Sequence, residues 1–185
     1  MALKNTSHSY GNIAKAFHWV VAICVIGMII VGFLLDAIPK PERYTVIQIH
    51  KSIGFTLLIV MTLRLFWRFL SPPPPLPGNV SRWQVIVAKM THGMLYISTF
   101  TMTISGWMMS SFYGYAINWF FLVKIPIPVD EKNRYLARIF SNIHDVAAWV
   151  FVVLICVHTL AALKHHFIDR DSILTRMLPG DGNTN

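Results

Sequence analysis

Charged residues are scarce in this sequence of 185 residues. Asp, Glu, Lys and Arg make up 13% of it, whereas 55% is hydrophobic, and the mean hydropathy is +0.53. An average soluble domain carries about 25% charged residues. The shortage argues against a soluble domain of this size and predicts an integral membrane protein built as one bundle.

Cysteines are also few, and no covalent haem attachment motif, Cys-x-x-Cys-His, occurs. Cys24 and Cys156 each lie inside an apolar run, so neither a disulfide framework nor a zinc knuckle is expected. The formal net charge of +8 comes from basic residues scattered between apolar runs, without a dense basic stretch. No nucleic-acid partner is therefore expected, and the lipid bilayer is the expected environment.

Four apolar stretches are long enough to cross a bilayer as helices, at about residues 14–35, 46–70, 83–112 and 142–163. Prolines punctuate the connections, with Pro39 and Pro41 after the first helix and a run at 72–75 after the second. The sequence thus predicts an all-α membrane protein. Its single four-helix domain covers residues 1–178, and a polar tail follows at 179–185.

Four spans place both termini on the same side of the membrane. Nine Lys and Arg residues fall on that side and seven on the other, where four of the seven lie in one long loop. Because short loops rich in Lys and Arg stay in the cytoplasm, both termini are expected there.

Two histidines mark the ends of the last apolar stretch. His144 and His158 are fourteen residues apart, which is about 21 Å along an α-helix, and fourteen steps of about 100° bring the side chains to within about 40° of each other. Both imidazoles therefore face the same neighbours, at two depths. A histidine in a membrane span is costly without a partner, so the pair predicts a function.

Two further histidines match these depths. His18 begins the first helix at the level of His158, and His50 begins the second helix at the level of His144. One helix thus supplies a ligand to each of two sites. Pairs of neutral imidazoles, without thiolates or carboxylates beside them, suit the two axial positions of a haem iron, whereas zinc would require four ligands.

Other polar residues near these sites have less defined roles. His92 shares the cytoplasmic level; its depth does not exclude it as a ligand, and a place beside the ligands or beside a quinone is favoured. Arg64 lies fourteen residues beyond His50 on the same face and is a candidate contact for a haem propionate. Arg68, one turn further, could bind a propionate or a lipid phosphate.

The remaining histidines lie outside the apolar stretches. His8 is expected to be solvated, and His165 and His166 are expected either on a solvated face or at the mouth of a site.

Several motifs together carry a family resemblance. They are FHW around His18, IQIHKSIG around His50, RLFWRFLSPPPP closing the second helix, the spacing from His144 to His158, and ALKHHFIDRDSILTRMLP near the end. With them the whole chain resembles the bacterial cytochrome b561 family, the small four-helix di-haem b-type cytochromes of the inner membrane.

The resemblance implies two non-covalent haem b groups. His18 and His158 would be the axial ligands of the cytoplasmic-side haem, and His50 and His144 those of the periplasmic-side haem, the same pairs that depth and facing give.

The resemblance also implies electron transfer to ubiquinone. The best-described activity in the family oxidises superoxide to dioxygen at the periplasmic face. His165 and Lys164, next to the inner haem, are the candidate quinone contacts.

Three other interpretations compete with this one, and one of them, a purely structural membrane protein, explains the hydrophobicity but leaves the two-level histidine pattern to chance. The other two are functional. The first is a cytochrome b subunit that carries electrons between quinone and a separate dehydrogenase, hydrogenase or soluble cytochrome. The second is a histidine-lined metal transporter, which would require carboxylates inside the helices, where Asp145 is the only candidate.

Overall fold

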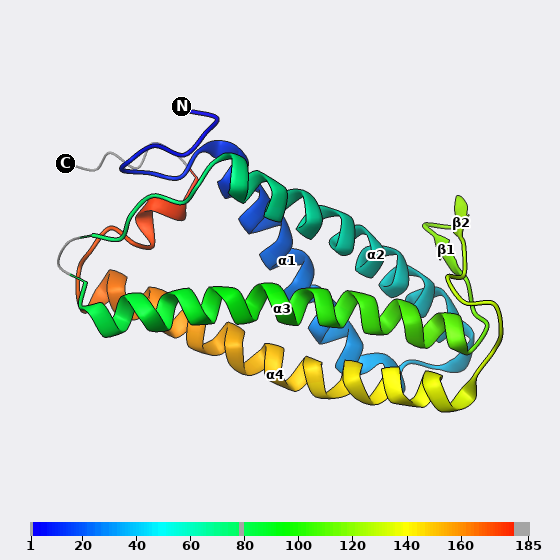
Figure 1. The fold of residues 1–185 in the computed structure, drawn as a ribbon. Helices are drawn as coiled ribbons and strands as arrows, with labels where there is room; N and C mark the ends of the chain where they lie inside the picture. Colours follow the sequence, from blue (N-terminus) through cyan, green and yellow to red (C-terminus); the bar gives the residue numbers. More distant parts are fainter. Residues whose placement is uncertain (1, 78–79, 180–185) are drawn as a thin grey trace.

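Four long helices dominate the computed structural model, which describes residues 2–77 and 80–179 (Figure 1). They are α1 (Asn12–Leu34), α2 (Lys40–Leu70), α3 (Arg82–Phe112) and α4 (Arg134–Phe167). Two 3₁₀ turns follow α1 and α4, namely η1 (Leu35–Ala37) and η2 (Thr175–Met177). Between α3 and α4 the chain forms an antiparallel hairpin of β1 (Ile117–Trp119) and β2 (Val123–Ile125). The predicted tail lies, apart from residue 179, outside the described residues.

The helix ends differ most from the expected bounds at α2 and α4. Proline is tolerated in the first turn of a helix, where its missing N–H has no partner to lose. Pro39 therefore caps α2 and Pro41 lies in its first turn, so α2 begins at Lys40 instead of about residue 46. Asn133 caps α4 by accepting hydrogen bonds from the backbone N–H groups of Tyr135 and Leu136. This cap starts α4 eight residues before the expected position, and the helix carries the polar Lys164 to His166 in its last turn.

Three of the four helices are long and apolar enough to cross a membrane: α1 extended through η1, α2 and α4. α3 has 31 residues, as long as α2, but it is not among the helices that meet this criterion, and it contains eight serines and threonines. It runs beside α4 over most of its length (Figure 1). Length and composition therefore support three spans directly, and α3 is placed in the bundle by its packing.

One end of the bundle, here called the terminal end, is capped by three segments of the chain. Asn5 ties the N-terminal segment to the end of α2: its backbone N–H donates to Ser71 Oγ (2.9 Å) and its side chain to the Ser71 carbonyl (2.8 Å). The C-terminal turn joins them, since Trp19 Nε1 donates to the carbonyl of Met177 (2.9 Å) and Arg176 donates to that of Pro75 (2.8 Å). The hairpin and the α1–α2 connection lie at the other end, here called the hairpin end (Figure 1).

An apolar core lies midway between the two ends. It consists of residues from three helices that are almost fully covered: Val21, Val25, Leu57, Met61 and Phe151. Most other large apolar side chains point outward, such as Ile23 in α1 and Val153 in α4. A small buried core surrounded by exposed aliphatic side chains is the pattern expected of a bundle in lipid.

Candidate functional site: two histidine groups at opposite ends of the bundle

At the terminal end three histidines from three helices meet. The ring centroids of His18 (α1) and His158 (α4) are 6.2 Å apart, and those of His92 (α3) and His158 are 5.3 Å apart. The structure thus brings the predicted pair together and adds His92, which lies closer to His158 than His18 does. These three residues with Arg64 are called the terminal-end cluster below.

Arg64 takes part in this cluster through His18. Its Nη2 donates to His18 Nδ1 over 3.1 Å. A guanidinium can only donate, so Nδ1 of His18 carries the lone pair and the ring proton lies on Nε2. His18 can therefore offer Nε2 to a metal only when Arg64 releases Nδ1.

Arg64 and Arg68 both face the ring of Tyr96 in α3, with the guanidinium carbons 5.5 and 5.8 Å from the ring centroid. Among residues 2–77 and 80–179, no carboxylate forms an ion pair with either arginine. Burial raises the pKa of the nearby Tyr10 phenol above its ordinary value of 10.0, although the charges of Arg68, Arg176 and Arg64 act in the opposite direction. The phenol is thus neutral at physiological pH, and the two arginines remain available to an anion.

At the hairpin end the imidazole of His144 is held in one tautomer. Its Nδ1 lies 3.0 Å from the carbonyl oxygen of Met102, which can only accept, so Nδ1 carries the proton. The hydroxyl of Ser105 lies 3.2 Å from the same nitrogen. This arrangement leaves the lone pair on Nε2, and a backbone carbonyl in this role is typical of metal-binding histidines.

Gly106 makes room for that ring. A Cβ added there would lie 3.1 Å from Cε1 and 3.2 Å from Nδ1 of His144, closer than side chains normally pack. The close approach depends on the missing side chain and not on an unusual backbone conformation.

His50 in α2 is the other histidine predicted as a ligand at the hairpin end. Its Nδ1 is buried and has no hydrogen-bond partner within the part of the chain that the structure describes. An apolar hollow of about 290 Å³ lies beside it between α1 and α2, lined among others by Gly27 and Met28. A buried ring nitrogen without a partner, next to an apolar space, fits a ligand of a flat apolar cofactor.

The two histidine groups are separated by the apolar core. Because α4 is one continuous helix, His144 and His158 lie about 21 Å apart along it. Phe151 is buried midway between them. The bundle therefore holds two separate groups of histidines, one near each end.

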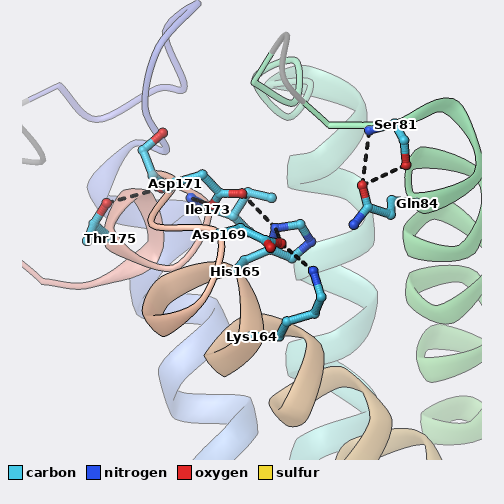
Figure 2. A network of polar contacts seen from close by, with 9 residues as sticks. Ser81, Gln84, Lys164, His165, Asp169, Asp171, Ile173 and Thr175 are labelled. Atoms are coloured by element: carbon cyan, nitrogen blue, oxygen red, sulfur yellow. Dashed lines mark hydrogen bonds and ion pairs between the residues drawn. The ribbon is translucent and has the colours of Figure 1, made fainter.

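The end of α4 forms a separate polar network (Figure 2). His165 Nδ1 lies 2.6 Å from Asp171 Oδ2 and 3.2 Å from Asp169 Oδ2, and Lys164 Nζ lies 2.5 Å from Asp169 Oδ2. The Asp171 side chain is 3% exposed, and its Oδ1 accepts a hydrogen bond from the backbone N–H of Ile173 (2.9 Å). The histidine and the two carboxylates have the composition of a metal site, but the Lys164 ammonium already neutralises one of the carboxylates.

Sequence reasoning missed Asp169 and Asp171. The available signal was their position four and six residues after His165, just beyond the end of α4, where the chain can turn back onto the helix. His8 is exposed, as expected, and the ring of His166 packs against Phe167 with centroids 4.7 Å apart.

Comparison with known proteins identifies the family. The sequence pattern of the prokaryotic cytochrome b561 family matches residues 9–180. Cytochrome b561 homolog 2 of Escherichia coli (strain K12) is 37% identical over 181 residues, covering 96% of this chain and 95% of that protein. Cytochrome b561 homolog 1 of the same organism is 30% identical over 138 residues, covering 71% of this chain and 74% of that protein. Probable superoxide oxidase CybB of Yersinia pestis is 27% identical over 170 residues, covering 92% and 96%.

The resemblance predicted from the motifs is thereby confirmed, and it carries membrane electron transfer and b-type haem with it. The chain belongs to the prokaryotic cytochrome b561 family.

Proposed function

We propose that this protein is a transmembrane di-haem cytochrome that takes electrons from superoxide at the periplasmic side and passes them to ubiquinone at the cytoplasmic side. It would lie in the bacterial inner membrane with both termini in the cytoplasm, so that the hairpin end faces the periplasm. The observation that carries the proposal is the presence of two imidazole groups, about 21 Å apart on one helix and separated by an apolar core. A metal transporter would require carboxylates along this path, and Asp145 is the only one inside the expected spans.

At the hairpin end His50 and His144 would hold one haem b. The backbone carbonyl of Met102 orients His144, and the missing side chain of Gly106 leaves room for the His144 ring to pack against α3. A histidine fixed in this way loses little conformational freedom on binding, which favours a stable axial ligand.

At the terminal end His18 and His158 would hold the second haem b. Arg64 would then turn from His18 Nδ1 to a propionate, which removes the obstacle to coordination and gives the arginine a negative partner. His92, at 5.3 Å from His158, is the alternative partner for His158, and the experiment below includes it.

Haem b held by two imidazoles supplies one-electron chemistry, because its iron alternates between the ferric and ferrous states. Overall, two superoxide ions would each give up one electron and leave as dioxygen, and one ubiquinone would gain two electrons and two protons. The chain has to bring protons to the quinone at the terminal end.

His165 is the proposed proton donor to the quinone. When both ring nitrogens carry a proton, Asp171 accepts a hydrogen bond from Nδ1 of His165 and fixes the ring, and the Nε2–H is the group that would donate to a quinone oxygen. Lys164, paired with Asp169, is the proposed second contact for a quinone carbonyl.

The test is the haem content of the purified protein with single histidine substitutions. Pyridine haemochromogen assays and reduced-minus-oxidised spectra are expected to give two haems b per chain for the wild type and one for His50→Ala and for His158→Ala. His166→Ala, at the same end as His158, is the matched control and should keep both.

The spectra of the two variants should differ, because each keeps a different haem. His18→Ala and His92→Ala then separate the two candidate partners of His158, and the one that loses a haem is the ligand. A colourless wild type, or a haem content that survives both substitutions, contradicts the proposal.

The donor is tested separately with the loaded protein in proteoliposomes. Superoxide, generated by xanthine oxidase, is expected to reduce the haems and then ubiquinone, and superoxide dismutase should stop both. If only dithionite or a partner dehydrogenase reduces them, the di-haem assignment stands and superoxide is the wrong donor.

A further inference from the structure

The hairpin between α3 and α4 has a closed turn made of apolar residues. Phe120 and Phe121 adopt positive φ angles of 46° and 61°, a conformation that favours glycine. The turn is held by hydrogen bonds from the backbone N–H groups of Phe121 to Asn118 (3.1 Å) and of Leu122 to Trp119 (3.0 Å). A turn whose backbone donors are paired in this way can enter an apolar medium at little cost.

A polar stripe on α2 anchors the hairpin. Gln48, Ser52 and Thr56 follow one another at intervals of four residues and so share one face of the helix. The Asn118 N–H donates to Gln48 Oε1 (3.3 Å) and the Trp119 indole N–H to Thr56 Oγ1 (3.0 Å).

Ser52 is the centre of this stripe. It is fully buried, and its Oγ accepts from the Phe120 N–H over 2.9 Å. The side chains of the stripe therefore accept hydrogen bonds from the hairpin, while the hydroxyls of Ser52 and Thr56 donate to carbonyls of α2.

The length of α2 indicates that these contacts fall within the depth of a bilayer. α2 has 31 residues, about 46 Å, whereas the hydrocarbon core of a bilayer is about 30 Å thick. About twenty residues, roughly 30 Å, separate Gln48 from Arg68 in the last turn of α2. With Gln48 and Arg68 placed at the two edges of the hydrocarbon, Ser52 would lie about 6 Å inside it, and a tilt of α2 with Arg68 kept at its edge would place Ser52 deeper. In Figure 1 the hairpin stands beside the first half of α2 and does not extend beyond the helix end.

The tip of the hairpin faces away from the protein. Phe121 is 48% exposed, Leu122 77% and Val123 55%. We propose that this tip, residues 120–123, lies at the hydrocarbon edge of the leaflet at the hairpin end. The hairpin would then be an interfacial membrane anchor that fixes the depth of α2 in the bilayer. The partner of this surface is the acyl-chain region of the bilayer. The proposal does not depend on the electron donor or on the number of haems.

The experiment is spin-label depth measurement on the full haem-loaded chain in nanodiscs. Labels are attached to Leu122→Cys, Val153→Cys and Glu131→Cys in a background with Cys24→Ala and Cys156→Ala, whose haem content is checked first. Val153 in α4 is 60% exposed and is the hydrocarbon reference. Glu131, exposed in the same connection as the hairpin, is the aqueous reference.

For each label we take the accessibility to oxygen divided by the accessibility to a water-soluble nickel chelate, a ratio that is high in hydrocarbon. We expect the ratio for the label at residue 122 to be several-fold higher than that at residue 131. It should be equal to or somewhat lower than the ratio at residue 153. A ratio at 122 equal to that at 131 would overturn the proposal. Ser52→Ala, added to the Leu122→Cys variant, removes the anchor of the turn and should move the label toward the aqueous value. An unchanged ratio in that variant would show that the stripe on α2 does not hold the tip in the leaflet.

Discussion

The two histidine groups are built on different principles. At the hairpin end His144 is held by a backbone carbonyl and faces a glycine, so its orientation is fixed by the main chain of α3. At the terminal end His18 is held by the long side chain of Arg64, and a third imidazole, His92, lies within reach of His158. A main-chain contact cannot move without moving the helix, whereas a side chain can change its partner. If each end holds a haem as proposed, the hairpin end would offer one ligand, His144, that is already oriented, and the terminal end would have to rearrange to bind its haem.

The largest effect is expected from a substitution that removes the space for the His144 ring at the hairpin end. In Gly106→Val the new side chain would collide with the His144 ring, since even a Cβ would lie 3.1 Å from it. We expect loss of the hairpin-end haem, with a reduced-minus-oxidised spectrum equal to that of His50→Ala. Gly93→Val on the same helix is the matched control, because a Cβ there would have no neighbour within 4 Å. If Gly106→Val retains both haems, the site does not depend on this glycine.

The next effect tests whether the terminal end rearranges. If Arg64 turns to a propionate, Arg64→Ala removes a charge-assisted hydrogen bond of about 1.5–3 kcal/mol, and the affinity for the terminal-end haem should fall at least about tenfold. If Arg64 stays on His18 Nδ1, the same substitution frees the ring and the affinity should rise. Titration of the apoprotein with haem, followed in the absorption spectrum of the terminal-end haem, distinguishes a fall in affinity from a rise. Arg82→Ala, an exposed arginine at the same end of the bundle, should change neither.

The position of both histidines on α4 could be predicted from the sequence. The fourteen-residue spacing of His144 and His158 depends only on helix periodicity, and α4 is indeed continuous across both. The place of His92 was left open because depth does not say which way a helix is rotated, and α3 has no clean apolar stripe from which to read its rotation.

The hairpin escaped prediction for a different reason. Each strand has three residues, and the turn contains no glycine, although two of its residues have positive φ. Ser52 on α2, 68 residues away, holds this turn. Contacts of this kind between distant segments leave no periodic pattern in the sequence.

The smallest expected effect concerns proton delivery at the terminal end. Asp171→Asn keeps the shape of the side chain but removes the negative charge that faces His165 Nδ1 at 2.6 Å. A charge-assisted hydrogen bond is worth about 1.5–3 kcal/mol and an uncharged one about 1 kcal/mol. We therefore expect the rate of ubiquinone reduction to fall about fivefold, with unchanged haem content and unchanged haem reduction by dithionite.

Asp169→Asn is the matched control, since its carboxylate is more exposed and lies farther from His165. It should lower the rate less than about twofold, as is usual for exposed ion pairs. If both variants slow quinone reduction equally, the network acts through its total charge and not through the orientation of His165, and if neither does, the quinone is reduced elsewhere.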